Sequence, residues 1–315
     1  MSTKLVDDIA DAVMYEGYLL YPYRASAVKN RQRWNFGVLY PRAFSEAQLG
    51  TDAWMMQTEC LARTTVMPAA LSIRVRFLHL IERTADGQSW QEAAPCEINV
   101  PKLYLTELAL HPARHLFTFP ATSETEGRIS PRREQIQGAI DAEAESLQDG
   151  LFKLRVGISN TTAFVDKIGM ARDAALMHSL VSTHTILVID GGEFVSLLDP
   201  PLDLRDIAAQ CRNIGTFPVL AGEDGQRDTM LSSPIILYDY PQIAPESAGA
   251  LFDATEIDEI LTLRIMTLTD DEKLEMHGDD RARKILERTE SMPPEQLMKM
   301  HGALRGLRRV SREEP

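Results

Sequence analysis

Cysteine is scarce in this sequence, and its three cysteines lie far apart. Cys60, Cys96 and Cys211 form no CxxC pair, and their odd number does not suit a disulfide framework. Their spacing fits neither zinc nor iron–sulfur ligation. We therefore expect reduced thiols and a cytoplasmic location. Cys211 has no histidine near it in the sequence, so we expect a buried thiol there and not a nucleophile or transient metal ligand.

Long apolar runs are missing too. No window approaches the roughly 18 apolar residues of a membrane-spanning helix. The first residues, MSTKLVDDIADAV, lack the apolar stretch behind a basic start that marks a signal peptide. Hydrophobic residues make up 44% of the 315 residues and charged residues 25%, proportions that are typical of a globular protein. The sequence therefore predicts a soluble, folded protein of one large or two ordinary domains without a membrane span.

Signatures of nucleotide and nucleic-acid binding are absent as well. The glycines at 191, 192, 222 and 225 do not form a GxGxxG or Walker pattern, so no nucleotide site is expected. Lys and Arg total 33 against 46 Asp and Glu, which gives a net charge of −13. Affinity for phosphate comes from clustered basic residues, so this balance argues against a general nucleic-acid binder.

Alternation of apolar side chains is the strongest structural signal that is present. The clearest case is 71–81, where Leu71, Ile73, Val75 and Phe77 share one face, as in a half-buried antiparallel strand. The same pattern predicts strands at 34–40, 55–63, 96–100, 115–119, 151–158, 185–189 and 194–198, and a hairpin of 217–220 with 235–238. Helices are expected at 130–148, 171–180 and 204–212, and beyond Asp253.

These patterns predict an α+β protein. Residues 1–200 would form an antiparallel, β-rich, sandwich-like domain with inserted helices. Residues 201–315 would form a mixed to mostly helical, acidic C-terminal region. The longest inserted helix has a typical start, because Ser130 can serve as N-cap and Pro131 as the first helical residue.

Some residues have the composition of a catalytic or metal site. His111 and His115 are spaced like a helical metal pair, but their surroundings predict a strand. The residue types of a hydrolase triad occur close together in the sequence at His178, Ser179, Ser182, His184 and Asp190. The GxSxG turn that would expose a nucleophile is missing. We therefore favour structural roles for these histidines and expect no catalytic residue and no bound metal.

Charge is distributed unevenly along the chain. Residues 223–280, here called the acidic segment, contain fifteen acids and three bases, which is −12 of the total charge of −13. Residues 17–45, the basic–aromatic segment, contain no acid and five bases interleaved with aromatic residues. The carboxylates at 253–259 could bind a cation, but a helix N-terminus also favours them.

Such polarity is typical either of partner binding or of a contact between the two segments. The residues predicted to contact a partner are Tyr21, Tyr23, Arg24, Lys29, Arg31, Arg33, Trp34, Tyr238, Asp239, Tyr240, Asp253, Glu256 and Glu259.

Four stretches resemble a known family. They are LLYPYRASAVKNRQRWNFGVLYP (19–41), GEFVSLLDPP (192–201), CRNIGTFPVL (211–220) and LSSPIILYDYPQIAPES (231–247). The family is encoded beside NiFe-hydrogenases, notably the high-affinity actinobacterial type, among the genes for their maturation factors. The resemblance implies a cytoplasmic accessory role in hydrogenase assembly or maturation, and it transfers no catalytic residue.

The expected function is therefore non-enzymatic binding of a hydrogenase subunit or a maturation protein, without a cofactor. The sequence lacks the CxxC motifs of the nickel- and iron-handling maturation proteins and the P-loop of the nickel-insertion GTPase. Two other classes stay open. One is a metal carrier or hydrolase-like enzyme that uses His178, His184 or His277. The other is a structural protein that forms homo-oligomers through its charged surfaces.

Overall fold

A computed structural model describes residues 2–14, 36–49, 52–85, 88–123, 130–148, 150–164 and 172–242. The chain divides into a compact unit formed by Met1–Gly17 and Arg33–Gln242 and a second unit formed by Tyr18–Gln32 and Ile243–Pro315. The helical region expected beyond Asp253 therefore lies outside the described residues. So do ten of the residues predicted to contact a partner, namely Tyr21, Tyr23, Arg24, Lys29, Arg31, Arg33, Trp34, Asp253, Glu256 and Glu259.

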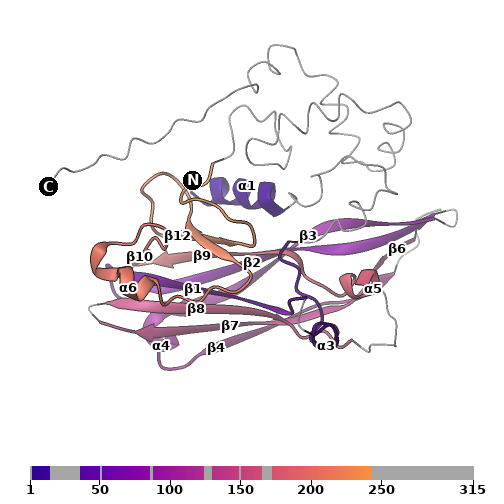
Figure 1. The fold of residues 1–315 in the computed structure, drawn as a ribbon, viewed down its shortest axis with the longest axis horizontal. Helices are drawn as coiled ribbons and strands as arrows, with labels where there is room; N and C mark the ends of the chain where they lie inside the picture. Colours follow the sequence, from indigo (N-terminus) through magenta and orange to yellow (C-terminus); the bar gives the residue numbers. More distant parts are fainter. Residues whose placement is uncertain are drawn as a thin grey trace, which may run out of the picture. The chain divides into compact units, whose positions relative to one another are not determined.

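Two antiparallel sheets form the compact unit (Figure 1). Sheet I has five strands in the order β10 (Gly192–Phe194), β1 (Met55–Thr64), β8 (Leu151–Asn160), β7 (Ile136–Ser146) and β4 (Ala113–Phe119). Sheet II has seven, in the order β11 (Phe217–Leu220), β12 (Thr229–Ser233), β9 (Val181–Asp190), β2 (Ala70–Ala85), β6 (Ser130–Arg133) and β5 (Thr122–Ser123), with β3 (Gln88–Tyr104) also paired with β2.

The described helices are few and mostly short. They are α1 (Ser2–Met14), α3 (Arg42–Ala47), α4 (Leu105–Leu108), α5 (Arg172–Leu176), the 3₁₀ helix η2 (Leu202–Leu204) and α6 (Arg205–Ala208). This part of the chain contains no helix with the length and apolar character needed to cross a membrane. The expectation of antiparallel β-sheets with inserted helices is confirmed.

A single apolar core lies between the two sheets. The alternating residues Leu71, Ile73 and Val75 of β2 point into it from sheet II. Leu154 and Val156 of β8 meet them from sheet I. Alternation therefore places the apolar side chains of each strand on the buried face, which is why the predictions for 55–63, 71–81 and 151–158 are confirmed.

The helix predicted at 130–148 is wrong. These residues form β6 and β7 instead, and β7 is hydrogen-bonded to β4 on one side and β8 on the other. Alanine and glutamate favour helices, but here Ile136, Ile140 and Ala142 alternate with polar residues and fill the core. Burial of that face in a central strand outweighs the local helix preference.

Other predicted elements are shorter or paired differently. Of the strand expected at 34–40, the described residues 36–40 form only an isolated bridge between Leu39 and Leu180, and the strand at 194–198 ends at Phe194. The helices expected at 171–180 and 204–212 shrink to α5 and α6. The partner of β11 is β12 and not 235–238. The predicted boundary near residue 200 falls inside the compact unit, because β12 pairs with β9.

Candidate protein-binding surface

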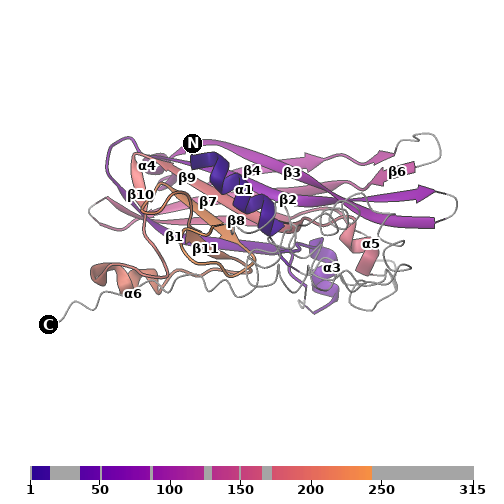
Figure 2. The same cartoon turned by 90° about the horizontal axis from the view of Figure 1, so that it is seen from above.

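Helix α1 packs on part of the outer face of sheet II (Figure 2). Val6, Ile9 and Ala10 occur at the spacing that places side chains on one side of a helix. They pack against Ile186 of β9 and Leu231 of β12 in a small apolar cluster. The apolar side of α1 is thus buried within the compact unit, over β9 and β12.

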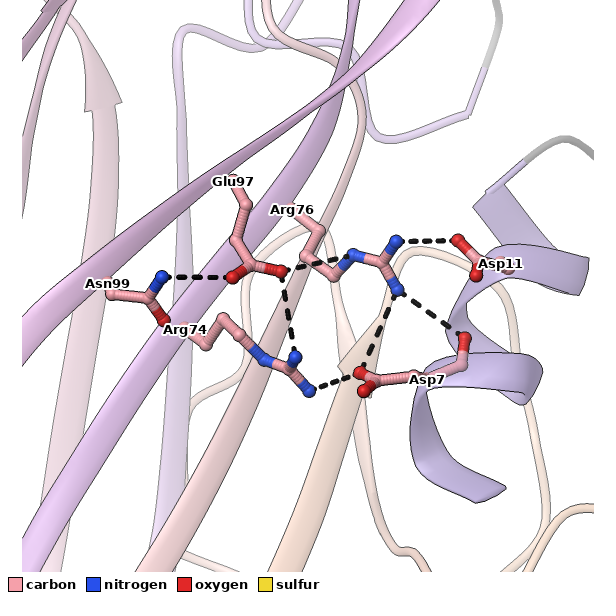
Figure 3. A network of polar contacts seen from close by, with 6 residues as sticks. All are labelled: Asp7, Asp11, Arg74, Arg76, Glu97 and Asn99. Carbon is pink, nitrogen blue, oxygen red and sulfur yellow. Dashed lines mark hydrogen bonds and ion pairs between the residues drawn. The ribbon is translucent and has the colours of Figure 1, made fainter. Parts of the chain in front are cut away.

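Ion pairs complement that apolar contact (Figure 3). Arg76 Nη2 donates to Asp11 Oδ1 at 2.5 Å, and Arg74 pairs with Asp7 one helical turn earlier. Glu97 Oε2 of β3 lies 3.6 Å from Arg74 Nη1 and 3.7 Å from Arg76 Nε. The Arg76 side chain is only 12% exposed, so these carboxylates are needed to offset the cost of burying its positive charge.

Neutralising these carboxylates should loosen α1. We expect the double variant Asp7→Asn, Asp11→Asn to speed amide exchange across α1 by about tenfold, because two partly exposed ion pairs are lost and each contributes about 0.5–1 kcal/mol. Hydrogen exchange with mass spectrometry measures this. Asp8→Asn, an exposed change on the same helix, is the matched control and should leave the exchange rate unchanged.

The residues of the proposed hydrolase triad are not brought together. Ser179 Oγ donates to the Ala175 carbonyl, and His184 Nδ1 lies 2.7 Å from the Ser182 carbonyl. Asp190 accepts a hydrogen bond from Lys102 Nζ at 2.7 Å, at the opposite end of β9 from Ser182. Ser179 and Asp190 thus have partners outside the predicted constellation, and the His184 ring contacts the Ser182 backbone and not its hydroxyl.

Two histidines are buried in the fold and held neutral. Burial lowers the pKa of His184 to about 4, the nearby Arg76 also lowers it, and the Ser182 carbonyl partly opposes them. Its Nε2 finds no hydrogen-bond partner among the described residues. Burial likewise lowers the pKa of His79 to about 4, although its Nε2 lies 2.9 Å from the Glu134 carbonyl. Both rings are therefore neutral at pH 7.

Neither the two thiols nor the pair His111 and His115 has the surroundings of a catalytic or metal site among the described residues. Burial raises the pKa of Cys60, and burial raises the pKa of the partly buried Cys211 to about 11, so both are protonated at neutral pH. His115 lies in β4, whereas His111 is exposed in the turn after α4. In the part of the chain that the structure describes, no three His, Cys, Asp or Glu residues are grouped to hold a metal ion.

Residues 204–214 cover part of the outer face of sheet I, over β1 and β8. Leu204 and Ala208 pack on Leu61 of β1 and Leu151 of β8. Beside this apolar contact, Gln57 and Ile214 exchange backbone hydrogen bonds. The covering segment is therefore attached to β1 and β8 by both apolar packing and hydrogen bonds.

A half-buried carboxylate completes the attachment. Glu59 Oε2 accepts a hydrogen bond from the Arg212 amide at 2.8 Å and lies 2.9 Å from Lys153 Nζ. The Glu59 amide donates to Asn213 Oδ1 at 2.8 Å. Burial alone would raise the pKa of Glu59, but the Arg212 amide and the Lys153 ammonium together hold it below its ordinary value. The carboxylate is thus charged and paired under the covering segment.

Another part of that face contains a hollow of about 460 Å³. Gly157 of β8 is one of its lining residues, and a Cβ at this position would meet only the Met56 carbonyl, at 3.9 Å. Ser159 and Thr161 also line the hollow. The missing side chain at Gly157 thus leaves an indentation in the middle of an otherwise filled sheet surface.

Arginine and tryptophan form the rim of the hollow. The Arg42 guanidinium lies 4.6 Å from the centre of the Trp54 ring, and its Nε donates to Glu46 Oε1 at 2.7 Å. Arg114 of β4 pairs with Asp141 of β7 at 3.5 Å. The rim therefore presents charges of both signs beside an aromatic ring.

A second hollow of about 210 Å³ adjoins the first, because Met55 lines both. Arg172 Nε donates to the Tyr40 hydroxyl at 2.8 Å, and Arg172 Nη2 lies 2.9 Å from Asp52 Oδ1. Burial raises the pKa of Tyr40, against the effect of Arg172, so the phenol is neutral at physiological pH and accepts the hydrogen bond from Arg172. Together the two hollows form what we call the rim surface, defined by Arg42, Trp54, Met55, Arg114, Asp141, Gly157 and Arg172.

Only three of the predicted partner-binding residues lie in the described part of the chain. Asp239 accepts hydrogen bonds from Ser196 Oγ at 2.5 Å and from the Leu220 amide at 2.8 Å. The Tyr240 amide donates to the Leu220 carbonyl at 2.7 Å. Both therefore attach residues 239–240 to the sandwich. The preceding residue, Tyr238, is 85% exposed, so its ring is accessible on the surface.

Sequence reasoning missed most of the rim surface. Arg42 belonged to the basic–aromatic segment, but Trp54, Arg114 and Gly157 carried no local signal. They come from different strands and loops and meet only because β4, β7, β8 and β1 are neighbours in sheet I. Protein-family models and curated protein sequences give no match to this chain.

Proposed function

We propose that the protein is a non-enzymatic accessory protein for NiFe-hydrogenase assembly or maturation, which acts by binding a hydrogenase subunit or another maturation protein. The observation that supports binding is the rim surface. Tryptophan, tyrosine and arginine are enriched among the residues that contribute most to protein–protein affinity. Here Trp54, Arg42, Arg114 and Arg172 surround two adjoining hollows. The hydrogenase context comes from the resemblance of the four stretches alone.

The electrostatics of this surface favour a protein partner over a small anion. Arg42, Arg114 and Arg172 are each already paired with a carboxylate of the same unit. A surface with charges of both signs selects a partner with the complementary pattern and fixes its orientation. Under this proposal the acidic and basic–aromatic segments steer association, with Tyr238 as a further contact.

Binding of purified hydrogenase subunits and maturation proteins tests the proposal. We expect Arg114→Ala to weaken binding to the partner at least tenfold, since loss of an interface arginine that contributes strongly to affinity commonly costs about 2 kcal/mol. Arg155→Ala is the matched control, because Arg155 pairs with Glu143 on the same face of sheet I but does not line either hollow. Isothermal titration calorimetry gives both affinities. Equal losses for the two variants would remove the rim surface from the proposal.

The acidic segment is tested separately. Charge reversal of Asp253, Glu256 and Glu259 should slow association most at low ionic strength. At high ionic strength the salt screens these charges, so they steer the encounter less and their reversal has a smaller effect. Stopped-flow association rates at two salt concentrations measure this. The metal-carrier alternative predicts a stoichiometric transition metal in the purified protein, and elemental analysis that finds one would overturn the non-enzymatic assignment.

A further inference from the structure

The described edges of the two sheets differ in how they are protected. Exposed edges pair with other chains unless they are short, interrupted by proline or covered. In sheet II, β5 is two residues long, β11 contains Pro218, and β3 contains Pro95 and Pro101. In sheet I, β10 is three residues long. The other edge of sheet I is β4, which spans seven residues without a proline.

The backbone of β4 has hydrogen-bonding groups that face away from sheet I. Gln137 of β7 accepts from the Thr161 amide and donates to Thr162 Oγ1, so its groups point toward β8. Groups alternate along a strand, so its neighbours Ile136 and Gly138 point toward β4, where they face Phe119 and Phe117. The amides and carbonyls of Arg114, Leu116 and Thr118 therefore point to the free edge. Among the described residues, β4 pairs only with β7.

We propose that β4 pairs with β4 of a second copy of this chain, antiparallel about a two-fold axis at Leu116. This register uses the whole strand, because Arg114 then faces Thr118 of the second copy and Thr118 faces its Arg114. The amides and carbonyls that point outward become hydrogen-bonded pairs. The five strands of sheet I in each copy join into one ten-stranded sheet.

The side chains of β4 are complementary to themselves in this register. Leu116 is 70% exposed, and the two-fold axis places it against its own counterpart, about 5 Å away between Cβ atoms. No like charges lie opposite each other, whereas an axis at Arg114 would place two guanidinium groups face to face. The second copy also brings its Thr118 next to Arg114 on the rim surface. This inference is independent of the hydrogenase partner.

Opposite charges at position 118 test the register. Thr118→Glu would face Arg114 of the second copy and should tighten the dimer, and Thr118→Arg should weaken it. A cross-strand charge pair contributes about 0.2–1 kcal/mol and occurs twice in the dimer, so each change should shift the dissociation constant by about 2-fold to 30-fold. Sedimentation equilibrium of the full chain across about a hundredfold range of concentration measures it.

Two further measurements make the result decisive. The control variants are Thr122→Glu and Thr122→Arg. They make the same charge changes at an exposed residue of β5, outside β4, and should leave the dissociation constant unchanged. In the wild type, amide exchange at Arg114, Leu116 and Thr118 should slow as the dimer forms. A chain that stays monomeric throughout, or a dimer that both Thr118 variants shift in the same direction, would overturn the proposal.

Discussion

The free energy of unfolding should fall steeply as the pH drops from about 6.5 toward 4, because two histidines are buried as neutral rings. The pKa values of His79 and His184 fall from 6.5 to about 4 in the fold. Above pH 6.5 the two histidines are neutral in the folded and in the unfolded chain, so the full free energy of unfolding is present. Below it, the unfolded chain binds protons that the fold excludes, so stability is lost at about 1.4 kcal/mol per pH unit for each histidine.

Chemical denaturation at a series of pH values measures this slope. We expect His184→Gln to remove about half of it, because glutamine cannot take up the proton and can still bond to the Ser182 carbonyl. His111→Gln is the control, since His111 is exposed. Glu59 contributes in a lower window, because its folded pKa lies below 4.5 and its stabilising effect is lost only as the pH falls below that value. A pH profile of His184→Gln parallel to that of the wild type would contradict the assignment.

Gly138→Ala should be among the most damaging single methyl additions in the sandwich. A Cβ at this position in β7 would lie 2.2 Å from Phe117 Cζ and 2.7 Å from the Ser159 carbonyl oxygen. The first clash requires the phenyl ring to move within the core, and the second requires a neighbouring strand to shift. Overpacking of this kind costs about 3 kcal/mol, so we expect a loss of that size.

Gly157→Ala is the matched control for Gly138→Ala. Gly157 lies on the neighbouring strand β8, but its Cβ would point into the hollow and meet only the Met56 carbonyl at 3.9 Å. Because alanine also restricts the unfolded chain, we expect a change between zero and a stabilisation of about 1 kcal/mol. Urea denaturation of both variants gives the comparison. Equal destabilisation by the two substitutions would mean that Gly138 does not face the core as the structure shows.

Gly157→Ala and Gly138→Ala can also be used to distinguish an effect on partner binding from an effect on stability. Gly157→Ala narrows the hollow while keeping the fold, so a loss of partner affinity in this variant cannot be attributed to unfolding. Gly138→Ala acts on the opposite face of sheet I and lowers stability without changing the rim surface. The pair therefore separates the two properties within one sheet.

Most of the fold could be predicted where a strand buries one face. Alternation at 71–81 and 151–158 predicts β2 and β8, because a pleated strand sends every second side chain into the core. The failure at 130–148 has a physical reason as well. Ser130 and Pro131 have the chemistry of a helix start, and alanine and glutamate favour helices, yet the alternation of Ile136, Gly138 and Ile140 was the signal that decided the structure.

The contacts between distant segments could not be predicted in the same way. Arg74 and Arg76 meet Asp7 and Asp11 only after α1 has packed on sheet II, and no local pattern connects residues that far apart. Thr58 of β1 likewise shares a hydrogen bond with Ser232 of β12 across the core, and Thr216, next to β11, shares one with the same hydroxyl. Such pairs depend on which strands are neighbours and in which register.

For the strands at 71–81 and 151–158, the sequence by itself determined which side chains are buried, because burial there follows from local alternation and hydrophobicity. It also determined where charge accumulates along the chain. Only the tertiary structure decided that Gly157 lines a hollow with Trp54 and Arg114, that α1 packs on β9 and β12, and that β4 pairs with β7 alone among the described residues. Those features arise from the order and pairing of strands, which are set by the packing of the whole core and not by any one segment.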